Sequence, residues 1–162
     1  MSLRNRPNPI RRALIVGIAA AGSAILWSPV GHAASNTETL RYYVKDVSTT
    51  ITRPDGTIIR HPPYPAPASG DVLEINSIDF KGDHRHHAKQ WTASQTQRCV
   101  FAAQGPPDCS VTVAIAGSLL IFRGSPGTLA NGTGRYQRAT GRVLKVDELK
   151  GGVDVVARVL VR

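Results

Sequence analysis

GTLANGTGRYQRATGRV, residues Gly127–Val143, places four glycines between two stretches with the composition of β-strands. Asn131-Gly132 suits a turn that needs a positive φ, which glycine adopts without steric cost. Gly134 and Gly141 remove side chains at points where coiled strands bend or approach each other closely. No helical pattern follows these glycines and no Lys-Ser or Lys-Thr pair accompanies them, which excludes a phosphate-binding loop. The segment therefore predicts a strongly curved β-sheet.

The same β-strand character extends over the rest of the chain. Arg142–Glu148 and Val153–Arg162 predict a hairpin that closes at Lys150-Gly151-Gly152. Further segments with alternating apolar residues or β-branched enrichment are Leu40–Thr52, Thr57–Arg60, Asp71–Lys81, Lys89–Phe101, Ser110–Gly117, Leu119–Arg123, Thr128–Ala130 and Tyr136–Ala139. No stretch after Ser35 repeats apolar residues with the helical period. These patterns predict about eight or nine strands and no helix.

So many antiparallel strands in a short chain must either expose their edges or close on themselves. A small closed antiparallel β-barrel of about eight strands removes the edges, so an all-β barrel is the predicted fold of residues 34–162. A two-sheet sandwich is the alternative. His61–Ser69 (HPPYPAPAS) contains four prolines and cannot join a central ladder, so a stiff surface loop is expected there.

The first 33 residues have the three-part layout of a secretory signal peptide. Met1–Arg12 holds four arginines and no acid, and the apolar run Ala13–Trp27 has 15 residues. Small residues before Ala33 indicate cleavage after that position, which predicts a bacterial-type secreted protein with the signal helix outside the fold. A membrane anchor is the alternative, although the apolar run is shorter than the roughly 20 residues of a spanning helix. Arg11-Arg12 also loosely fits a twin-arginine signal.

Charge and cysteine content limit the partners and the compartment. The full chain has a formal charge of +9, which becomes +5 without the four arginines of residues 1–33. The remaining cations are scattered singly, so no nucleic-acid partner is predicted and membrane contact is expected only during export. Cys99 and Cys109 flank a chain reversal at Gly105-Pro106-Pro107, and export favours a disulfide between them. A reactive thiol is the alternative.

Residues 70–162, and more weakly 40–52, resemble the allene oxide cyclase-like barrels, which are relatives of the plant dirigent proteins. The resemblance is carried by Gly70-Asp71 and Gly82-Asp83 around one strand, by Thr92-Ala93 leading to Cys99, and by the pattern Leu129, Gly132, Gly134, Tyr136 and Gly141. It implies a barrel whose interior holds an apolar, oxygenated small molecule without a cofactor. It also implies a homo-oligomer, as family members form trimers.

The resemblance places candidate site residues on several strands. In the cyclases, a carboxylate near the first strand and a tyrosine in the glycine-rich block assist ring closure. The carboxylate position falls near Asp46 or Lys45, and the tyrosine position falls on Thr140. A polar pocket residue corresponds to Ser77, and the family's cysteine corresponds to Cys99. These departures argue against cyclisation of a fatty-acid epoxide and leave the barrel and its cavity as expectations.

Asp46, Ser77 and Thr140 are therefore the candidate catalytic residues. The candidate ligand-binding residues are Tyr42, Asp46, Ser77, Trp91 and Thr140. Each has a structural alternative: Asp46 can be a surface carboxylate and Trp91 a core residue. Gly132, Gly134, Tyr136 and Gly141 are interpreted as structural residues of the glycine-rich block.

The histidine-rich run His84-Arg85-His86-His87 raises the possibility of a metal site. His84 and His86 would share one strand face, and Asp83 or His61 could approach them in space. No complete ligand set follows from the spacing, so a solvated loop is the preferred interpretation and no metal is predicted. No Ser-His-Asp set or paired-carboxylate motif can be argued from spacing either.

Three hypotheses for the function remain. The first is an isomerase, cyclase or dirigent-type guide that binds a lipophilic or phenolic molecule and orients its cyclisation or coupling without a cofactor. The second is a secreted binding protein without turnover. The third is a surface-interaction protein that uses the barrel only as a scaffold. A roomy cavity with Asp46, Ser77 and Thr140 together would favour the first, an apolar cavity the second and a solid interior the third.

Overall fold

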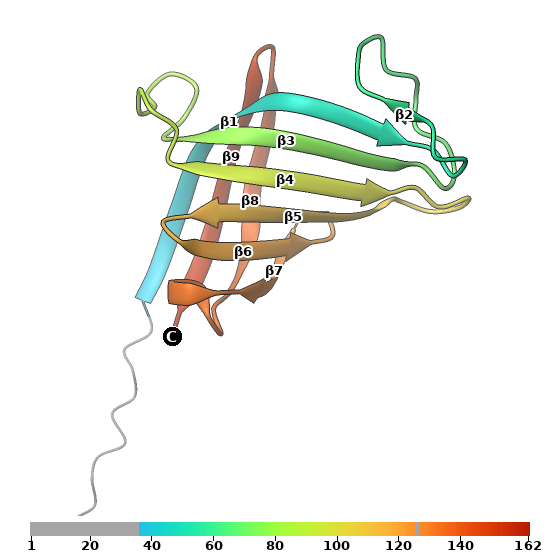
Figure 1. The fold of residues 1–162 in the computed structure, drawn as a ribbon. Helices are drawn as coiled ribbons and strands as arrows, with labels where there is room; N and C mark the ends of the chain where they lie inside the picture. Colours follow the sequence, from blue (N-terminus) through green and yellow to red (C-terminus); the bar gives the residue numbers. More distant parts are fainter. Residues whose placement is uncertain (1–35, 126) are drawn as a thin grey trace, which may run out of the picture. The chain divides into compact units, whose positions relative to one another are not determined.

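A computed structural model describes residues 36–125 and 127–162, which form a curved sheet with one short 3-10 turn (Figure 1). The predicted signal peptide, residues 1–33, lies outside the described residues. The elements are β1 (Asn36–Thr52), β2 (Ile58–Ile59), β3 (Val72–Lys81), β4 (Ala93–Val100), β5 (Asp108–Ile115), β6 (Ser118–Arg123), β7 (Thr128–Gly132), η1 (Gly134–Tyr136), β8 (Thr140–Leu149) and β9 (Gly152–Val161).

The sheet closes through its first long strand. Nine strands follow one another in the order β2-β1-β3-β4-β5-β6-β7-β8-β9, all antiparallel, and β1 also pairs with β9. The first half of β1, Asn36–Val44, pairs with β9, whereas Tyr42–Thr52 pairs with β3. β2 pairs only with β1, so the other eight strands form the wall. The closed antiparallel barrel is confirmed, and the two-sheet sandwich is wrong.

The register of β1 against β3 shifts between Asp46 and Ser48, which marks a β-bulge. A bulge bends its strand and increases the local twist. In Figure 1, the first half of β1 runs beside β9 and β8. Its second half bends away and runs beside β3 and β4. The long bent strand β1 therefore pairs with β9 through its first half and with β3 through its second half.

The glycine-rich block differs in two places from the expectation. Tyr136–Ala139 was predicted as a short strand, but η1 turns the chain there and Tyr136 is buried. Gly132 was predicted in a positive-φ turn, but it ends β7, and a Cβ there would lie 2.3 Å from the Tyr136 carbonyl oxygen. The positive φ occurs at Gly134, at 57°. Close approach, rather than a turn, therefore requires glycine at position 132.

η1 connects β7 and β8, the two neighbouring strands of the wall with the fewest register pairs. β7 and β8 share a single register pair, Thr128 with Arg142, whereas β1 and β9 share nine. Arg135 holds the turn with two 2.8 Å hydrogen bonds to Glu38 of β1, and its guanidinium lies 4.9 Å from the centre of the Tyr136 ring. Side-chain contacts thus hold η1 to β1, and its backbone N–H at Arg135 donates to the Ser118 hydroxyl of β6.

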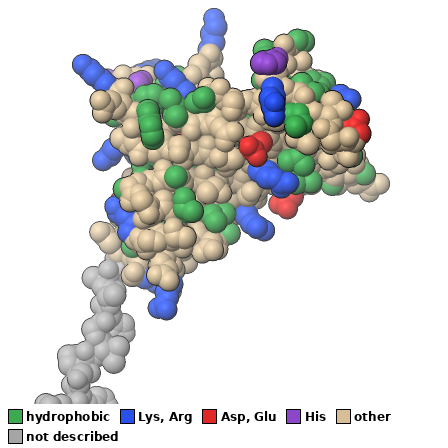
Figure 2. Space-filling view, viewed as in Figure 1, with side chains coloured by type: hydrophobic (Ala, Val, Ile, Leu, Met, Phe, Trp, Pro, Cys, Tyr) green, Lys and Arg blue, Asp and Glu red, His purple; other side chains and the backbone are tan. Residues whose placement is uncertain are grey.

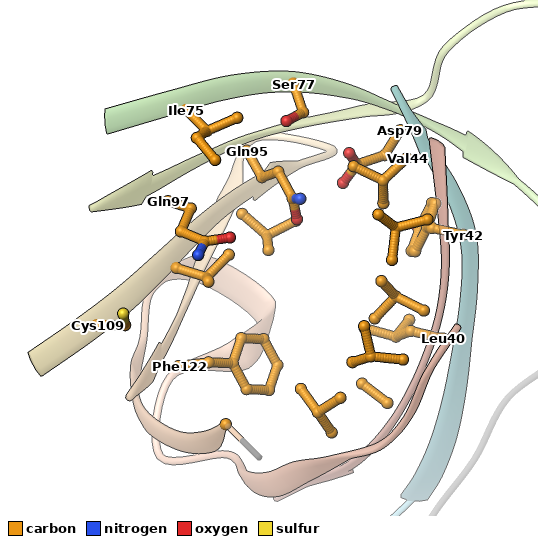
Figure 3. A pocket seen from close by; sticks show the side chains of 18 of the residues that line it. Leu40, Tyr42, Val44, Ile75, Ser77, Asp79, Gln95, Gln97, Cys109 and Phe122 are labelled. Atoms are coloured by element: carbon orange, nitrogen blue, oxygen red, sulfur yellow. The ribbon is translucent and has the colours of Figure 1, made fainter. Parts of the chain in front are cut away.

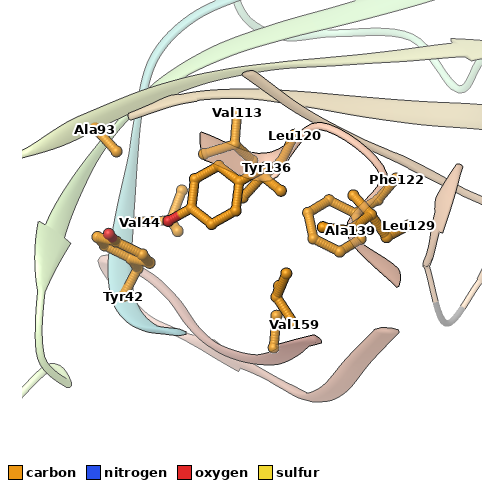
Figure 4. Close-up of a cluster of buried hydrophobic side chains, with 11 residues drawn as sticks. Tyr42, Val44, Ala93, Val113, Leu120, Phe122, Leu129, Tyr136, Ala139 and Val159 are labelled. Carbon is orange, nitrogen blue, oxygen red and sulfur yellow. The ribbon is translucent and has the colours of Figure 1, made fainter. Parts of the chain in front are cut away.

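One end of the barrel is filled by apolar side chains. Leu120, Tyr136 and Val159 are fully buried, and their strands bring them together from β6, η1 and β9 (Figure 4). Further members of this cluster are Tyr42, Val44, Ala93, Val113, Phe122, Leu129, Ala139 and Ala157. Fully burying one large apolar side chain contributes roughly 1.5–3 kcal/mol to folding, so this cluster is a major source of stability.

Cys99 of β4 and Cys109 of β5 form the predicted disulfide, with their sulfur atoms 2.05 Å apart. The two residues are direct register partners in the antiparallel ladder, which brings their Cα atoms to 4.1 Å. The proline-rich segment His61–Ser69 contains no strand, as expected. Its Tyr64 hydroxyl donates to the carbonyl oxygens of Thr49 and Arg60, which fastens the loop beside β1.

The surface is basic without a dominant patch. Lysine and arginine side chains are spread over the face shown in Figure 2, in agreement with their scattered positions in the sequence. Within residues 36–125 and 127–162, none of the helical structure has the length and hydrophobicity that crossing a membrane requires.

Candidate ligand cavity

The barrel interior beside the buried apolar cluster is hollow, with a cavity of about 620 Å³ that several residues of the cluster also line (Figure 3). Successive side chains of a strand point to opposite faces, so every second residue of the wall faces inward. On β1 these residues are Leu40, Tyr42, Val44 and Asp46, all of which line the cavity. The alternation that predicted the strands therefore also builds the cavity wall.

The cavity has two chemically different sides. β8 and β9 contribute a mainly apolar side that includes Val143, Val153 and Val155, with the exposed Glu148 as its one charged residue. β3 and β4 contribute a polar side, on which Ser77, Asp79, Gln95 and Gln97 point into the cavity (Figure 3). A ligand that fits both sides is mainly apolar and carries a few hydrogen-bonding groups.

A hydrogen-bonded pair lies where the cavity meets solvent. The hydroxyl of Ser77, which is buried, donates to Oδ1 of the exposed Asp46 at 2.8 Å. The two residues are register partners on β3 and β1, directly before the bulge of β1. Val146 and Leu149 of β8 also line this end and are 55% and 37% exposed. Asp46 is thus within reach of both the cavity and water.

A second carboxyl group lies deep in the cavity wall. Asp79 is 1% exposed, and its Oδ1 atom has no hydrogen-bond partner among the described residues. Burial raises the pKa of the Asp79 carboxyl to about 7, because the charged form loses its hydration. Burial, together with Tyr136 and Asp79 nearby, raises the pKa of Tyr42 to about 12. This inner end therefore holds protonated groups at neutral or mildly acidic pH.

Tyr136 adds a further hydroxyl close to this inner end. Its ring is fully buried and its hydroxyl points toward Tyr42 and Val44, both of which line the cavity (Figure 4). Within the part of the chain that is described, the hydroxyl has no hydrogen-bond partner. Burial, with Glu38 nearby, raises the pKa of Tyr136.

The structure brings some of the predicted site residues together and separates others. Tyr42, Asp46 and Ser77 line the cavity. Thr140 is exposed on β8 opposite Leu160, and Trp91 is 59% exposed between β3 and β4, so neither lies in the lining. The roles of all five residues in binding or catalysis stay predictions.

Sequence reasoning did not select Asp79, Gln95 and Gln97 as site residues. The signal was present, because Asp79 follows Ser77 by two positions and thus shares its strand face. Gln95 and Gln97 alternate in the same way on β4, opposite Ser77 and Ile75. What the sequence did not reveal is which end of the barrel stays hollow.

The histidine run lies on a loop outside the cavity. Nδ1 of His84 is 2.5 Å from Oδ2 of Asp154, and the His84 backbone N–H donates to Oδ1 of the same carboxylate at 2.8 Å. The His86 side chain is largely exposed. Within the described residues, no three histidine, cysteine or acidic side chains are grouped closely enough to hold a metal ion. His84 thus fastens the β3–β4 loop to β9.

Comparison with known proteins gives a likeness in structure only. No family model matches the chain, and no curated protein matches its sequence. The solved structure of the pterocarpan synthase dirigent protein GePTS1 matches with a TM-score of 0.58 at 17% identity, covering 88% of this chain and 99% of the other. The chain has a dirigent-like barrel fold.

Two further solved structures share this dirigent-like barrel. The pterocarpan synthase dirigent protein PsPTS1 matches with a TM-score of 0.50 at 16% identity, covering 78% of this chain and 96% of its own. A pyocyanin demethylase matches with a TM-score of 0.55 at 14% identity, covering 75% of this chain and 99% of its own. At these identities the likeness establishes the fold alone. The chemistry has to be inferred from the residues of the cavity.

Proposed function

We propose that this protein binds a small lipophilic molecule in the barrel and guides its cyclisation or coupling without a cofactor. The main support is the cavity of about 620 Å³ with an apolar side and a polar side. The apolar side would hold the carbon skeleton, and the polar side would fix its orientation. Holding a flexible reactant in one geometry accelerates ring closure because the ordering entropy is lost on binding, before the reaction.

The Asp46–Ser77 pair supports a role in a reaction rather than in binding alone. Asp46 contacts solvent and also lines the cavity, so its carboxylate can exchange protons with water while it faces a bound molecule. Ser77 holds the carboxylate in place through the 2.8 Å hydrogen bond. Asp46 would then act as the general base or acid of the guided reaction, with Ser77 as its positioning residue.

The named activities of the solved structures with the same fold support the proposal that the barrel binds a small molecule. They are named as pterocarpan synthases and as a pyocyanin demethylase, and each of these names denotes action on a small molecule. The disulfide fits an extracellular protein, so we place the activity outside the cytoplasm, after removal of residues 1–33. N-terminal sequencing of the exported protein should begin at position 34.

Native mass spectrometry of the protein from its own producer tests the binding. A retained small molecule is expected, and Val111→Phe should displace it because Val111 faces the cavity. Thr112→Phe is the matched control, since its side chain lies on the opposite face of β5. Retention of the ligand in both variants would place it outside the barrel, and a thermal melt of each variant checks that a loss does not come from unfolding.

A secreted binder without turnover is the second candidate, and the same ligand separates the two. The protein guides a reaction if it converts the ligand faster than the uncatalysed rate. Asp46→Asn should then reduce this rate at least tenfold while binding is retained. Binding that is unaccompanied by any conversion supports the binder. The hollow interior argues against a barrel that serves only as a scaffold.

A further inference from the structure

The most unusual side chain in the cavity is Asp79, because it is a buried acid and one of its carboxyl oxygens has no partner among the described residues. It is 1% exposed and lines the cavity, and its Oδ1 atom lacks a hydrogen-bond partner among the described residues. Its register partners, Val44 on β1 and Ala93 on β4, are apolar. A buried polar group without a partner costs roughly 1–3 kcal/mol, so such groups usually have a partner that is absent from the bare protein.

The surroundings of Asp79 keep it protonated. Tyr42 of β1 interacts electrostatically with Asp79 and also with Tyr136 of η1, and burial raises the pKa of both tyrosines. The lining also holds Glu148 of β8, which is exposed. Asp46 lies further along the same wall and is hydrogen-bonded to Ser77. No lysine, arginine or histidine is among the lining residues that the structure describes. No cation on the cavity wall therefore compensates an ionised Asp79.

We propose that Asp79 anchors the ligand by donating a hydrogen bond from its carboxylic acid group to a carbonyl oxygen at the inner end of an otherwise apolar molecule. The Tyr136 hydroxyl, which points toward this region and lacks a partner, is the second donor available to the same oxygen. The inference rests on the proposed function, because it needs a ligand in the barrel. It assigns that ligand to the class of ketones, quinones and related carbonyl compounds.

A carbonyl fits this site better than the other partners of a carboxyl group. An amine would require a buried ion pair, whose desolvation offsets its Coulombic attraction. A purely apolar ligand would leave Asp79 and Tyr136 without partners and would keep their full desolvation cost. A neutral acceptor satisfies the donors without bringing a charge into the apolar end of the barrel.

Two probes of nearly the same shape test the assignment, 2-acetylnaphthalene and 2-ethylnaphthalene. Isothermal titration calorimetry at pH 5.5 should show about tenfold tighter binding of the ketone, as one buried hydrogen bond predicts. At pH 8.5, where Asp79 is ionised and cannot donate, this preference should fall several-fold, to the part that the Tyr136 hydroxyl alone supplies. Affinity for 2-ethylnaphthalene should change much less with pH, because it makes no hydrogen bond.

Variants assign the effect to the residue. Asp79→Asn keeps an N–H donor and does not titrate, so it should keep the ketone preference at both pH values. Asp79→Leu should reduce the preference at both pH values to the level that the wild type shows at pH 8.5. Asp108→Asn, at an exposed position outside the cavity lining, is the matched control and should preserve the pH dependence of the wild type. A thermal melt of each variant checks that it is folded.

The outcomes separate this inference from the proposed function. If neither probe binds at any pH, the proposed cavity function fails and the anchor fails with it. If both probes bind equally well at pH 5.5, the cavity function stands and the carbonyl anchor is wrong. If 2-(aminomethyl)naphthalene binds more tightly than the ketone at pH 8.5, Asp79 is a site for cations and the proposal is overturned.

Discussion

At one end of the barrel interior Tyr136 and Val159 are fully buried and lie outside the cavity lining, whereas at the other end the inward-facing Val146 and Leu149 are 55% and 37% exposed. Both ends are built by the same alternation of inward and outward side chains. They differ in whether an additional element fills the space, as η1 inserts Tyr136 at one end and nothing comparable occupies the other. The barrel interior thus passes from a packed end to an open end, and Leu120 belongs both to the packed cluster and to the cavity wall.

The strongest test of this division is Tyr136→Ala. Truncating a large aromatic side chain in a packed core costs about 3–5 kcal/mol, and the free energy of unfolding in urea should fall by that amount. Tyr136→Phe is the matched control and should be neutral or slightly stabilising, because it removes only a hydroxyl that has no partner in the described structure. A small effect of Tyr136→Ala would show that the packed end does not dominate stability.

The second test uses Asp79, which sits where the two ends meet. Its folded pKa, about 7, exceeds the usual value of 3.8, so between these values the native state binds a proton that the unfolded state has released. Stability should therefore fall as the pH rises from about 4 to about 7 and then level off, by up to about 4 kcal/mol. Urea unfolding at several pH values measures it.

Asp79→Asn gives this second test its control. The amide does not titrate, so the variant should lack the fall and should be more stable than the wild type at pH 8. A wild type whose stability rises between pH 4 and pH 7 would contradict the assignment of Asp79 as a buried, unpaired acid.

The third test concerns the disulfide, whose Cys109 lines the hollow end. Replacing both cysteines by serine should cost roughly 2–3 kcal/mol, the chain-entropy value for so short a loop, because their sequence separation is 10. The thermal melt of the double variant should coincide with that of the reduced wild type. A larger loss in the double variant would point to serine packing rather than to the missing bond.

The smallest effect is expected at the Glu38–Arg135 ion pair beside η1. Both side chains are partly exposed, so Glu38→Gln should change the free energy of unfolding by less than about 1 kcal/mol. The loss should shrink in high salt, which screens exposed charges. Asp55→Asn, at an exposed turn, is the comparison, and an equal salt response there would show that Glu38 has no particular role.

The sequence was sufficient for the features that depend on local pattern. Alternation predicted the strands and placed Asp79 and Ser77 on one face, and the reversal between Cys99 and Cys109 predicted the disulfide. The two candidate residues on adjacent strands, Asp46 and Ser77, are hydrogen-bonded in the structure.

Features that depend on distant contacts could not be predicted. Tyr136–Ala139 has the composition of a strand, but Gly134 allows a positive φ and the core accepts the tyrosine ring, so a 3-10 turn forms instead. Thr140 was a candidate because it occupies the position of the family's tyrosine in the glycine-rich block. In the structure it lies on β8 opposite Leu160 and its side chain is exposed. Which end is hollow depends on η1, a turn too short to leave a periodic signal.

The closure of the barrel through β1 and β9 has a consequence for folding kinetics. The Tyr43 hydroxyl donates to the Gly151 carbonyl oxygen across 108 positions of sequence, and the pairing of these two strands joins equally distant parts of the chain. Because loop-closure entropy must be overcome before such distant contacts form, proteins rich in them fold slowly. The chain cannot complete its barrel until β9 has been synthesised, so the edge of β1 that pairs with β9 stays open until then.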